Sequence, residues 1–543
     1  MPNLQSIQAI AEAAGLGPAD IEPHGHYIAK LAQPVVDRAS AEQKGKLVLV
    51  SAMTPTPAGE GKTTTSIGLA QGLKRKGKSS MLALREPSLG PCMGMKGGAT
   101  GGGASSIHPE DRINLHFTGD LHAITSAHNL LAAMLDNHLH FDNPRGIRQA
   151  NWKRVLDMND RALRNVVVGL GGTKNGFTRE TSFDITAASE VMAMLCLAEN
   201  REDLEQRIDR TWIGFDNEGR AVTPKDINAT TGMLVLLKDA LLPNLVQTTE
   251  GVPALIHGGP FANIAHGCNS VIATKTALGL ADWVVTEAGF AFDLGGEKFF
   301  DIKCRSAGLD VAAVVLVGTI RALKMHGGVA LDQLSKPNSE AVAKGIGNIE
   351  KHIDSIRAFG KEPILALNKF PTDSQAEVDV VAELCRRLNI RMSEASHFAD
   401  GGAGADDLAQ AVLDTSESKP LQYLYEDDAS VSTKIESIAR RIYGARSVLF
   451  TTQAQKQLAR VEQLGLTHLP VCMAKTQKSL SDDPSKLGRP TDFDITVRDV
   501  EISTGAGFLV ILTGDMMRMP GLPRVPRSEK LRLEGDSIHG LMG

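Results

Sequence analysis

The sequence predicts an α/β protein built on a mostly parallel sheet. Short runs of β-branched and other apolar residues alternate with segments of helical spacing. This alternation is typical of parallel sheets, because each parallel connection needs a crossover. A glycine-rich loop directly follows the apolar run at residues 46–50 and opens a helical segment that ends near Gly77. Together these observations predict a P-loop NTPase-like sheet in a large nucleotide domain.

The apolar runs that we expect to form strands follow one another along the chain. Residues 46–53 precede the glycine-rich loop and its helix, and residues 79–86 come directly after them. Such runs indicate the strands of a mostly parallel sheet, and the run at 46–50 indicates a buried strand. The later runs occupy residues 165–172, 253–259, 282–290, 312–323 and 362–370.

A chain of 543 residues is too long for one hydrophobic core, so several domains are expected. We expect the nucleotide domain to span residues 1–350. Two smaller α/β domains are expected over residues 351–460 and 461–543. The segments rich in Pro, Ser, Asp or Gly are too short for disordered linkers and indicate excursions between compact parts.

Composition narrows the class of protein. Apolar residues make up 42% of the chain and charged residues 22%, as in globular enzymes. A net charge of −5 without a dense Lys/Arg run argues against nucleic acid as a partner. No basic leader occurs, and no stretch approaches the roughly 18 apolar residues of a membrane span, so we expect a cytoplasmic protein without membrane contact. Six widely spaced cysteines without a CxxC pair argue against a zinc site or a disulfide framework.

The glycine-rich loop resembles a phosphate-binding loop that lacks its first glycine. The usual pattern is G-x-x-x-x-G-K-[ST], and here Thr56 stands at the first glycine while Gly61, Lys62 and Thr63 match. Backbone amides and the positive end of the helix would wrap phosphate oxygens. Lys62 would neutralise the outer phosphates, and the Thr63 hydroxyl would bind Mg²⁺. The expected nucleotide-binding residues of this loop are Thr56, Pro57, Ala58, Gly59, Glu60, Gly61, Lys62 and Thr63.

A second polar stretch follows the second apolar run. It reads LREPSLGPCMGMKGGATGGG over residues 84–103 and places Arg85, Glu86 and Lys96 where ligands of parallel sheets bind. Arg85 has the geometry to form two hydrogen bonds to a carboxylate or an acyl phosphate. The stretch therefore predicts a site for a second anion beside the outermost phosphate.

Several strings together resemble the formate–tetrahydrofolate ligase family in its monofunctional form. TPTPAGEGKTTT, REPSLGP, KGGATGGG and NLHFTGDLHAITSAHNLLAAMLDNHL are similar to its successive signatures, and later strings up to GAGFLVILTGDMMRMPGLPRVP follow in the same order. The resemblance thus covers nearly the whole chain. It implies ATP-dependent joining of formate to N10 of tetrahydrofolate, which gives 10-formyltetrahydrofolate, ADP and phosphate. It also implies a homotetramer and activation by a monovalent cation such as K⁺ or NH₄⁺.

The resemblance assigns roles to further residues. Formyl phosphate would be the intermediate, with Lys62 stabilising the transferring phosphoryl group and Arg85 holding formate. Glu86 is expected to bind the monovalent cation, with a simple ion pair to Arg85 as the alternative. Asp120 is expected to act on Mg²⁺ through water or to orient formate, with capping of a helix start as the alternative. The 461–543 part is expected to contact adenine through Pro520, Gly521 and Leu522.

The folate ring needs flat partners, and aromatic residues make up only 4% of this chain. Phe370 follows the apolar run 363–367, and the family uses this phenylalanine as one face of a clamp on the pteridine. Phe398 stands where the family commonly has tryptophan. Relatives read close to VWAKGGEGG in this stretch, so Asp400 and Ala403 replace a lysine and a glutamate, which affects the expected affinity for folate.

Two alternatives to the formate ligase remain at this stage. One is an ATP-dependent ligase or kinase that activates another small carboxylate, and the substitutions at 398–403 keep it open. The other is a P-loop ATPase that switches between protein partners. Proteins of that class usually carry a lysine early in the loop and often a cysteine pair, and this chain has neither.

Overall fold

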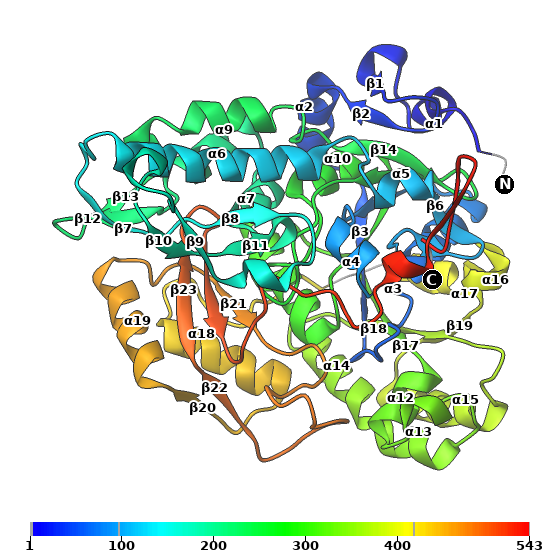
Figure 1. Ribbon diagram of the computed structural model, residues 1–543. Helices are drawn as coiled ribbons and strands as arrows, with labels where there is room; N and C mark the ends of the chain where they lie inside the picture. Colours follow the sequence, from blue (N-terminus) through cyan, green and yellow to red (C-terminus); the bar gives the residue numbers. More distant parts are fainter. Residues whose placement is uncertain (1–3, 96–97, 416–418, 542–543) are drawn as a thin grey trace.

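The computed structural model describes residues 4–95, 98–415 and 419–541. Its centre is a 12-stranded sheet whose middle strands are all parallel, with helices on both faces (Figure 1). The parallel strands, in spatial order, are β15 (Pro253–Ile256), β4 (Ser80–Leu84), β16 (Trp283–Glu287), β3 (Lys46–Ala52), β17 (Ala313–Gly318), β18 (Pro363–Asn368) and β19 (Met392–Ala395). The predicted α/β class with a mostly parallel sheet is confirmed.

Antiparallel strands extend one side of this sheet. β14 (Asn244–Thr248) pairs antiparallel with β15, and β2 (Ala29–Leu31) and β1 (Ile21–Pro23) continue outward from it. A short hairpin of β5 (Gly101–Gly102) and β6 (Ser105–His108) joins at β14. The N-terminal residues therefore reach the same sheet as the glycine-rich loop.

The central strands are buried on both faces, as their apolar sequences predict. In β3, Leu47 and Leu49 belong to one hydrophobic cluster, while Val48 and Val50 belong to the other. Helices α3 (Lys62–Arg75) and α17 (Asp406–Leu413) cover the second face. Helices α10 (Val271–Leu280) and α14 (Gly347–Arg357) pack on the first.

The run at residues 165–172 differs from the expectation. It forms β9 (Val166–Val168), which pairs antiparallel with β10 (Arg179–Thr181) in a small separate hairpin. Val167 is 47% exposed, so these valines do not form a buried parallel strand. An apolar triplet alone did not distinguish an exposed hairpin from a core strand.

Beyond the main sheet lie several smaller sheets and further helices (Figure 1). Helix α6 (Asp120–His140) packs against α9 (Thr230–Leu237), and β24 (Phe508–Leu512) lies between β21 (Val471–Ala474) and β23 (Asp499–Ser503). The expected boundary near residue 350 falls inside α14, and β18 and β19 continue the large sheet beyond it.

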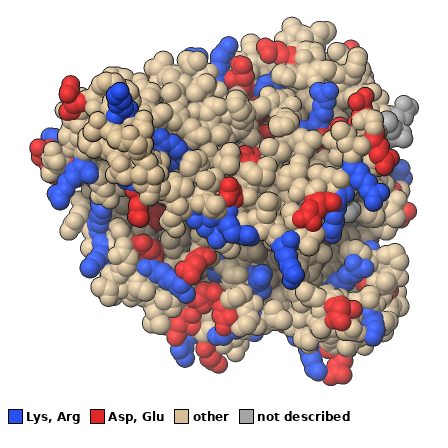
Figure 2. Space-filling view, viewed as in Figure 1, with Lys and Arg blue, Asp and Glu red and all other residues tan. Residues whose placement is uncertain are grey.

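Surface charge is mixed on the face that Figure 2 presents, where Lys and Arg alternate with Asp and Glu. Among the residues that the structure describes, no helix is long and apolar enough to cross a bilayer.

Candidate active site

The candidate site lies at the edge of the sheet where the parallel strands end. The glycine-rich loop leaves β3 at this edge, Arg85 and Glu86 leave β4, and Phe370 follows β18. Because parallel strands end at one common edge, residues far apart in the sequence meet there. Asn368 shows this directly, since its Nδ2 donates a hydrogen bond of 3.1 Å to the backbone oxygen of Glu60.

The loop that opens helix α3 contains two glycines in the left-handed region of the backbone. Gly59 and Gly61 have φ angles of +85° and +77°, which side-chain-bearing residues rarely adopt. Gly61 precedes the first helical residue, Lys62. The amides at the start of α3 have no intrahelical acceptor, so the helix presents donors and a positive dipole end at this edge.

Glu60 turns into the protein and braces the loop. Its carboxylate accepts a hydrogen bond of 2.7 Å from the Thr56 amide and another from the Thr319 hydroxyl. Burial raises the pKa of the Glu60 carboxyl, against the lowering effect of these hydrogen bonds. The side chains of Glu60 and Thr56 are therefore buried and stabilise the loop. Glu60 could contact a nucleotide only through its backbone.

Lys62, Thr63 and Glu287 form the charged centre of this edge. Thr63 Oγ1 donates a hydrogen bond of 2.9 Å to Glu287 Oε2, which is the last residue of β16. Burial lowers the pKa of Lys62, and the nearby Arg85 guanidinium lowers it further, while Glu287 and Glu60 act in the opposite direction. Lys62 is thus a cation held in a partly desolvated position with carboxylates nearby.

Glu287 was missed by the sequence reasoning. A signal existed, because DWVVTE is an apolar strand that ends in a carboxylate. Only the sheet order shows that this strand lies between β3 and β4 and so places Glu287 beside the loop.

Arg85 lies against two backbone segments that leave little free space. Its Nη1 donates a hydrogen bond of 3.3 Å to the Pro260 oxygen. A Cβ atom on Gly289 would come within 3.0 Å of the same Nη1, so the absence of a side chain there makes room for the guanidinium. Arg85 Nε is buried without a hydrogen-bond partner in the described part of the chain. The guanidinium therefore has unused capacity to bind an anion.

Glu86 is buried in a cluster of charges. Its Oε2 has no hydrogen-bond partner among the described residues. Burial raises the pKa of the Glu86 carboxyl well above its usual range, and the Asp120 carboxylate raises it further while Lys30 opposes the shift. The expected alternative, a direct ion pair with Arg85, is absent from the ion pairs found within the described residues.

Asp120 is held in a buried ion pair with Lys30, at 2.8 Å. Its Oδ2 also accepts hydrogen bonds from Lys30 at 3.1 Å and from Asn244 Nδ2 at 2.7 Å. Both carboxylate oxygens thus already have partners, which argues against the expected part in holding magnesium water. The capping alternative is also unsupported, because the helix that starts at Asp120 has no side-chain cap. Lys30 comes from an antiparallel strand, and no sequence signal linked it to this site.

The two aromatic candidates follow neighbouring parallel strands. Phe370 comes after β18 and Phe398 lies in α16 (His397–Asp400) after β19. Phe398 is 60% exposed, so its ring is open to contact with a ligand. Phe370 has the Arg321 guanidinium 4.0 Å from its ring centre. Arg321 was not predicted, and nothing in its sequence context marks it.

The segment with Pro520, Gly521 and Leu522 is anchored by arginines. Arg164 Nε donates a hydrogen bond of 2.9 Å to the Met519 oxygen, and Arg161 donates to the Leu522 oxygen. The Arg527 amide reaches the Gly94 oxygen at 2.7 Å, which joins this segment to the turn after Arg85 and Glu86. Contact with adenine stays a prediction, and Lys96 lies outside the described residues.

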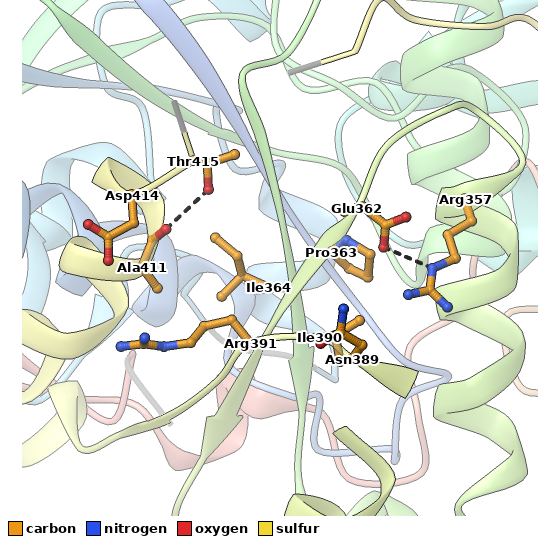
Figure 3. A pocket seen from close by; sticks show the side chains of 10 residues that line it. All are labelled: Arg357, Glu362, Pro363, Ile364, Asn389, Ile390, Arg391, Ala411, Asp414 and Thr415. Carbon is orange, nitrogen blue, oxygen red and sulfur yellow. Dashed lines mark hydrogen bonds and ion pairs between the residues drawn. The ribbon is translucent and has the colours of Figure 1, made fainter. Parts of the chain in front are cut away.

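A cavity of about 520 Å³ lies elsewhere, at the opposite edge of the sheet (Figure 3). Pro363 and Ile364, which line it, begin β18, so the cavity lies at the amino ends of the strands. Its arginines are engaged, because Arg357 pairs with Glu362 at 2.9 Å and Arg391 with Asp407 at 2.7 Å. Both arginines that line this cavity are therefore held by carboxylates of the protein.

The fold and the site define an α/β protein with a glycine-rich strand–loop–helix site, a lysine and an arginine at one sheet edge, as in enzymes that handle phosphorylated ligands. The family model described as formate–tetrahydrofolate ligase matches residues 2–542. Formate–tetrahydrofolate ligases of Methylobacterium nodulans and Methylorubrum extorquens strain PA1 are both 53% identical to the chain, over 99% of it and 98% of each relative. The chain belongs to the formate–tetrahydrofolate ligase family.

Proposed function

We propose that this protein joins formate to N10 of tetrahydrofolate with consumption of ATP, giving 10-formyltetrahydrofolate, ADP and phosphate. The observations that support the proposal are that Lys62 and Arg85 lie close enough to interact, and that Phe370 follows β18, whose last residue, Asn368, contacts the loop, in a chain of this family. These groups correspond to the three needs of the reaction, which are phosphoryl transfer, carboxylate binding and stacking of a flat acceptor.

The first step activates formate. A formate oxygen attacks the γ-phosphorus, the bond from that phosphorus to the β–γ bridging oxygen breaks, and formyl phosphate and ADP result. Lys62 and the amides at the start of α3 stabilise charge on the transferring group. Thr63 and Glu287 supply oxygen ligands of the kind that Mg²⁺ prefers, and the ion when bound neutralises phosphate charge.

The second step transfers the formyl group. The N10 amine attacks the formyl carbon, its proton is lost, and the carbon–oxygen bond to phosphate breaks. Arg85 would hold formate first and the acyl phosphate afterwards, because both present oxygens to the guanidinium. Phe370 and Phe398 would stack on the pteridine, and Pro520, Gly521 and Leu522 would lie against adenine.

A monovalent cation, K⁺ or NH₄⁺, fits at Glu86. The buried Glu86 Oε2 has no partner in the described chain, and the carboxyl groups of Asp120 and Asp157 both act on Glu86, opposed by Lys30. A bound cation would offset this negative charge. Its site would then lie directly next to Arg85 in the sequence, so that cation binding and formate binding depend on one turn.

Replacing Glu86 by glutamine should therefore weaken activation by K⁺. The amide keeps the size and one acceptor oxygen but removes the charge, so the K⁺ concentration for half-maximal activity should rise about tenfold or more. Rates at 0.1–300 mM K⁺, at constant ionic strength with a large organic cation, measure this shift. Glu394→Gln, at an exposed carboxylate paired with Lys369, is the matched control. An unchanged K⁺ response in Glu86→Gln would remove Glu86 from the cation site.

Replacing Glu287 by glutamine should raise the KM for magnesium-bound ATP about tenfold or more, because a charged hydrogen bond to Thr63 and a magnesium-side carboxylate are lost together. The measurement is the initial rate against ATP at several free Mg²⁺ concentrations. Asp282→Asn, at the exposed opposite end of β16, should behave like the parent. Equal Mg²⁺ dependence in both variants would assign Glu287 a supporting role only.

We further infer the finer organisation. The glycine-rich loop and sheet are of the P-loop NTPase type. Residues 1–350 carry the nucleotide and formate groups, residues 351–460 carry the folate clamp and residues 461–543 add to the nucleotide site, while the large sheet itself runs across residue 350. The chain works in the cytoplasm as a homotetramer, which sedimentation at micromolar concentration tests.

The test of the function is an omission experiment. The protein is incubated with ATP, Mg²⁺, K⁺, formate and tetrahydrofolate, acidified, and the absorbance of methenyltetrahydrofolate is read. Product should form only when all three substrates are present, with one ADP released per product. ATP hydrolysis that never yields this product, and that another small carboxylate stimulates, would replace the proposal with activation of that carboxylate.

A further inference from the structure

Helix α16, which carries Phe398, is docked directly onto the helix of the nucleotide loop. His397 is fully buried, and its side chain lies over Gly68 of α3. A Cβ on Gly68 would come within 2.5 Å of the His397 Cβ, so only glycine permits this approach. The two helices thus pack with almost no space between them, so a displacement of one helix requires a displacement of the other.

A chain of hydrogen bonds joins the loop to the histidine. Thr65 Oγ1 donates to the Gly61 backbone oxygen at 2.9 Å, and the same oxygen lies 3.2 Å from His397 Nε2. Since the single hydroxyl proton of Thr65 points to Gly61, Thr65 accepts a hydrogen bond from His397, and Nε2 carries the proton. Gly61 is the last residue of the phosphate loop before α3.

The backbone around Phe398 is fixed from the other side as well. The Ser105 hydroxyl donates a hydrogen bond of 2.8 Å to the His397 oxygen, and the Ala104 amide donates one of 2.8 Å to the Phe398 oxygen. Phe398 itself stays 60% exposed. Its position is therefore set by the hairpin at 101–108 and by the His397 side chain in the α3 contact.

We propose that His397 is a positioning residue that couples the nucleotide loop to the folate site through Thr65. The proposal rests on the proposed function. When phosphates order the loop, Gly61 and the first turn of α3 become fixed, and the Thr65–His397 bond transmits this order to α16 and Phe398. ATP and tetrahydrofolate should then bind more tightly together than separately, although neither contacts His397.

The coupling is measured as a ratio of dissociation constants. The Kd of tetrahydrofolate is determined by calorimetry with and without a saturating, non-hydrolysable ATP analogue and Mg²⁺. In the parent the ratio should be about 5 or more, within the usual range of coupling between sites. In Thr65→Val, which keeps the shape and removes the hydroxyl, the ratio should fall to about 1. Thr65→Ser, which keeps the hydroxyl, should restore it.

Variants of His397 give a second, independent test of the coupling. His397→Gln retains a donor near the Nε2 position and should retain coupling, whereas His397→Leu should lose it. This pair decides the question if Thr65→Val does not fold. A purely structural role would lower the thermal unfolding midpoint without changing the ratio.

Coupling that persists in folded Thr65→Val or His397→Leu would overturn the proposal, as would a ratio of 1 in the parent. A parent that neither binds tetrahydrofolate nor forms product would overturn the proposed function and this inference together. A parent that forms product, with variants that keep the parental ratio, would overturn only the inference.

Discussion

Lys62→Met is expected to reduce formation of 10-formyltetrahydrofolate by about 10³-fold or more. Methionine is close to lysine in length and apolar, so the packing of α3 is retained while the charge on the phosphoryl group loses its partner. Arg85 and the helix amides remain, which is why a small residual rate is expected. The acidified absorbance of methenyltetrahydrofolate gives the rate, and binding of an ATP analogue shows whether the nucleotide site survives.

Lys62→Arg supplies the matched control, because it keeps the charge at a pKa above that of lysine. Burial and Arg85 lower the pKa of Lys62, so the neutral form appears at lower pH than for a free lysine. As pH rises through that lowered pKa, kcat/KM for ATP in the parent should fall. In Lys62→Arg this alkaline decline should move to higher pH. A Lys62→Met rate above one tenth of the parent's would contradict the assigned role.

The sequence predicted the parts of the fold whose cause is local. The strand before the loop and the helix that starts at Lys62 follow from an apolar run and from helical spacing. The exposed hairpin of β9 was mistaken for a core strand, because an apolar triplet does not reveal whether its faces are covered. Whether the two faces of a strand are covered depends on partners that lie far along the chain.

For the candidate site, too, residues with a local sequence signal were predicted and their distant partners were not. Lys62 and Thr63 were predicted because they match the phosphate-loop pattern after a strand, and Arg85 because it directly follows one. The partners of these residues were not found. Lys30 reaches Asp120 across 90 residues and His397 reaches Thr65 across 332, so neither pair has a signal within any window of the sequence. Asp120 shows the consequence, since its own segment predicted a reactive group and its distant partner shows a buried ion pair.

Arg85→Ala should reduce the rate of product formation to about 10⁻³ of the parent's rate or less. Its Kd for an ATP analogue should stay within about twofold of the parent's. In the proposed mechanism the Arg85 guanidinium holds a carboxylate beside the phosphates, and alanine leaves neither charge nor donor. Arg85→Lys keeps the charge without the two-pronged geometry and should retain an intermediate rate. Arg75 lies on the exposed side of α3, where it pairs with Asp406. Arg75→Ala should therefore leave the rate of product formation almost unchanged.

The formate dependence of Arg85→Ala separates two roles of this residue. If Arg85 only binds formate, saturating formate should restore kcat and the whole loss should lie in KM. If it also holds the acyl phosphate while the folate amine attacks, kcat stays low at any formate concentration, because the interaction is then needed beyond the bound substrate. The second outcome is expected, since one guanidinium with an unpartnered Nε lies where both species must bind. A KM for formate equal to the parent's would remove Arg85 from the carboxylate site altogether.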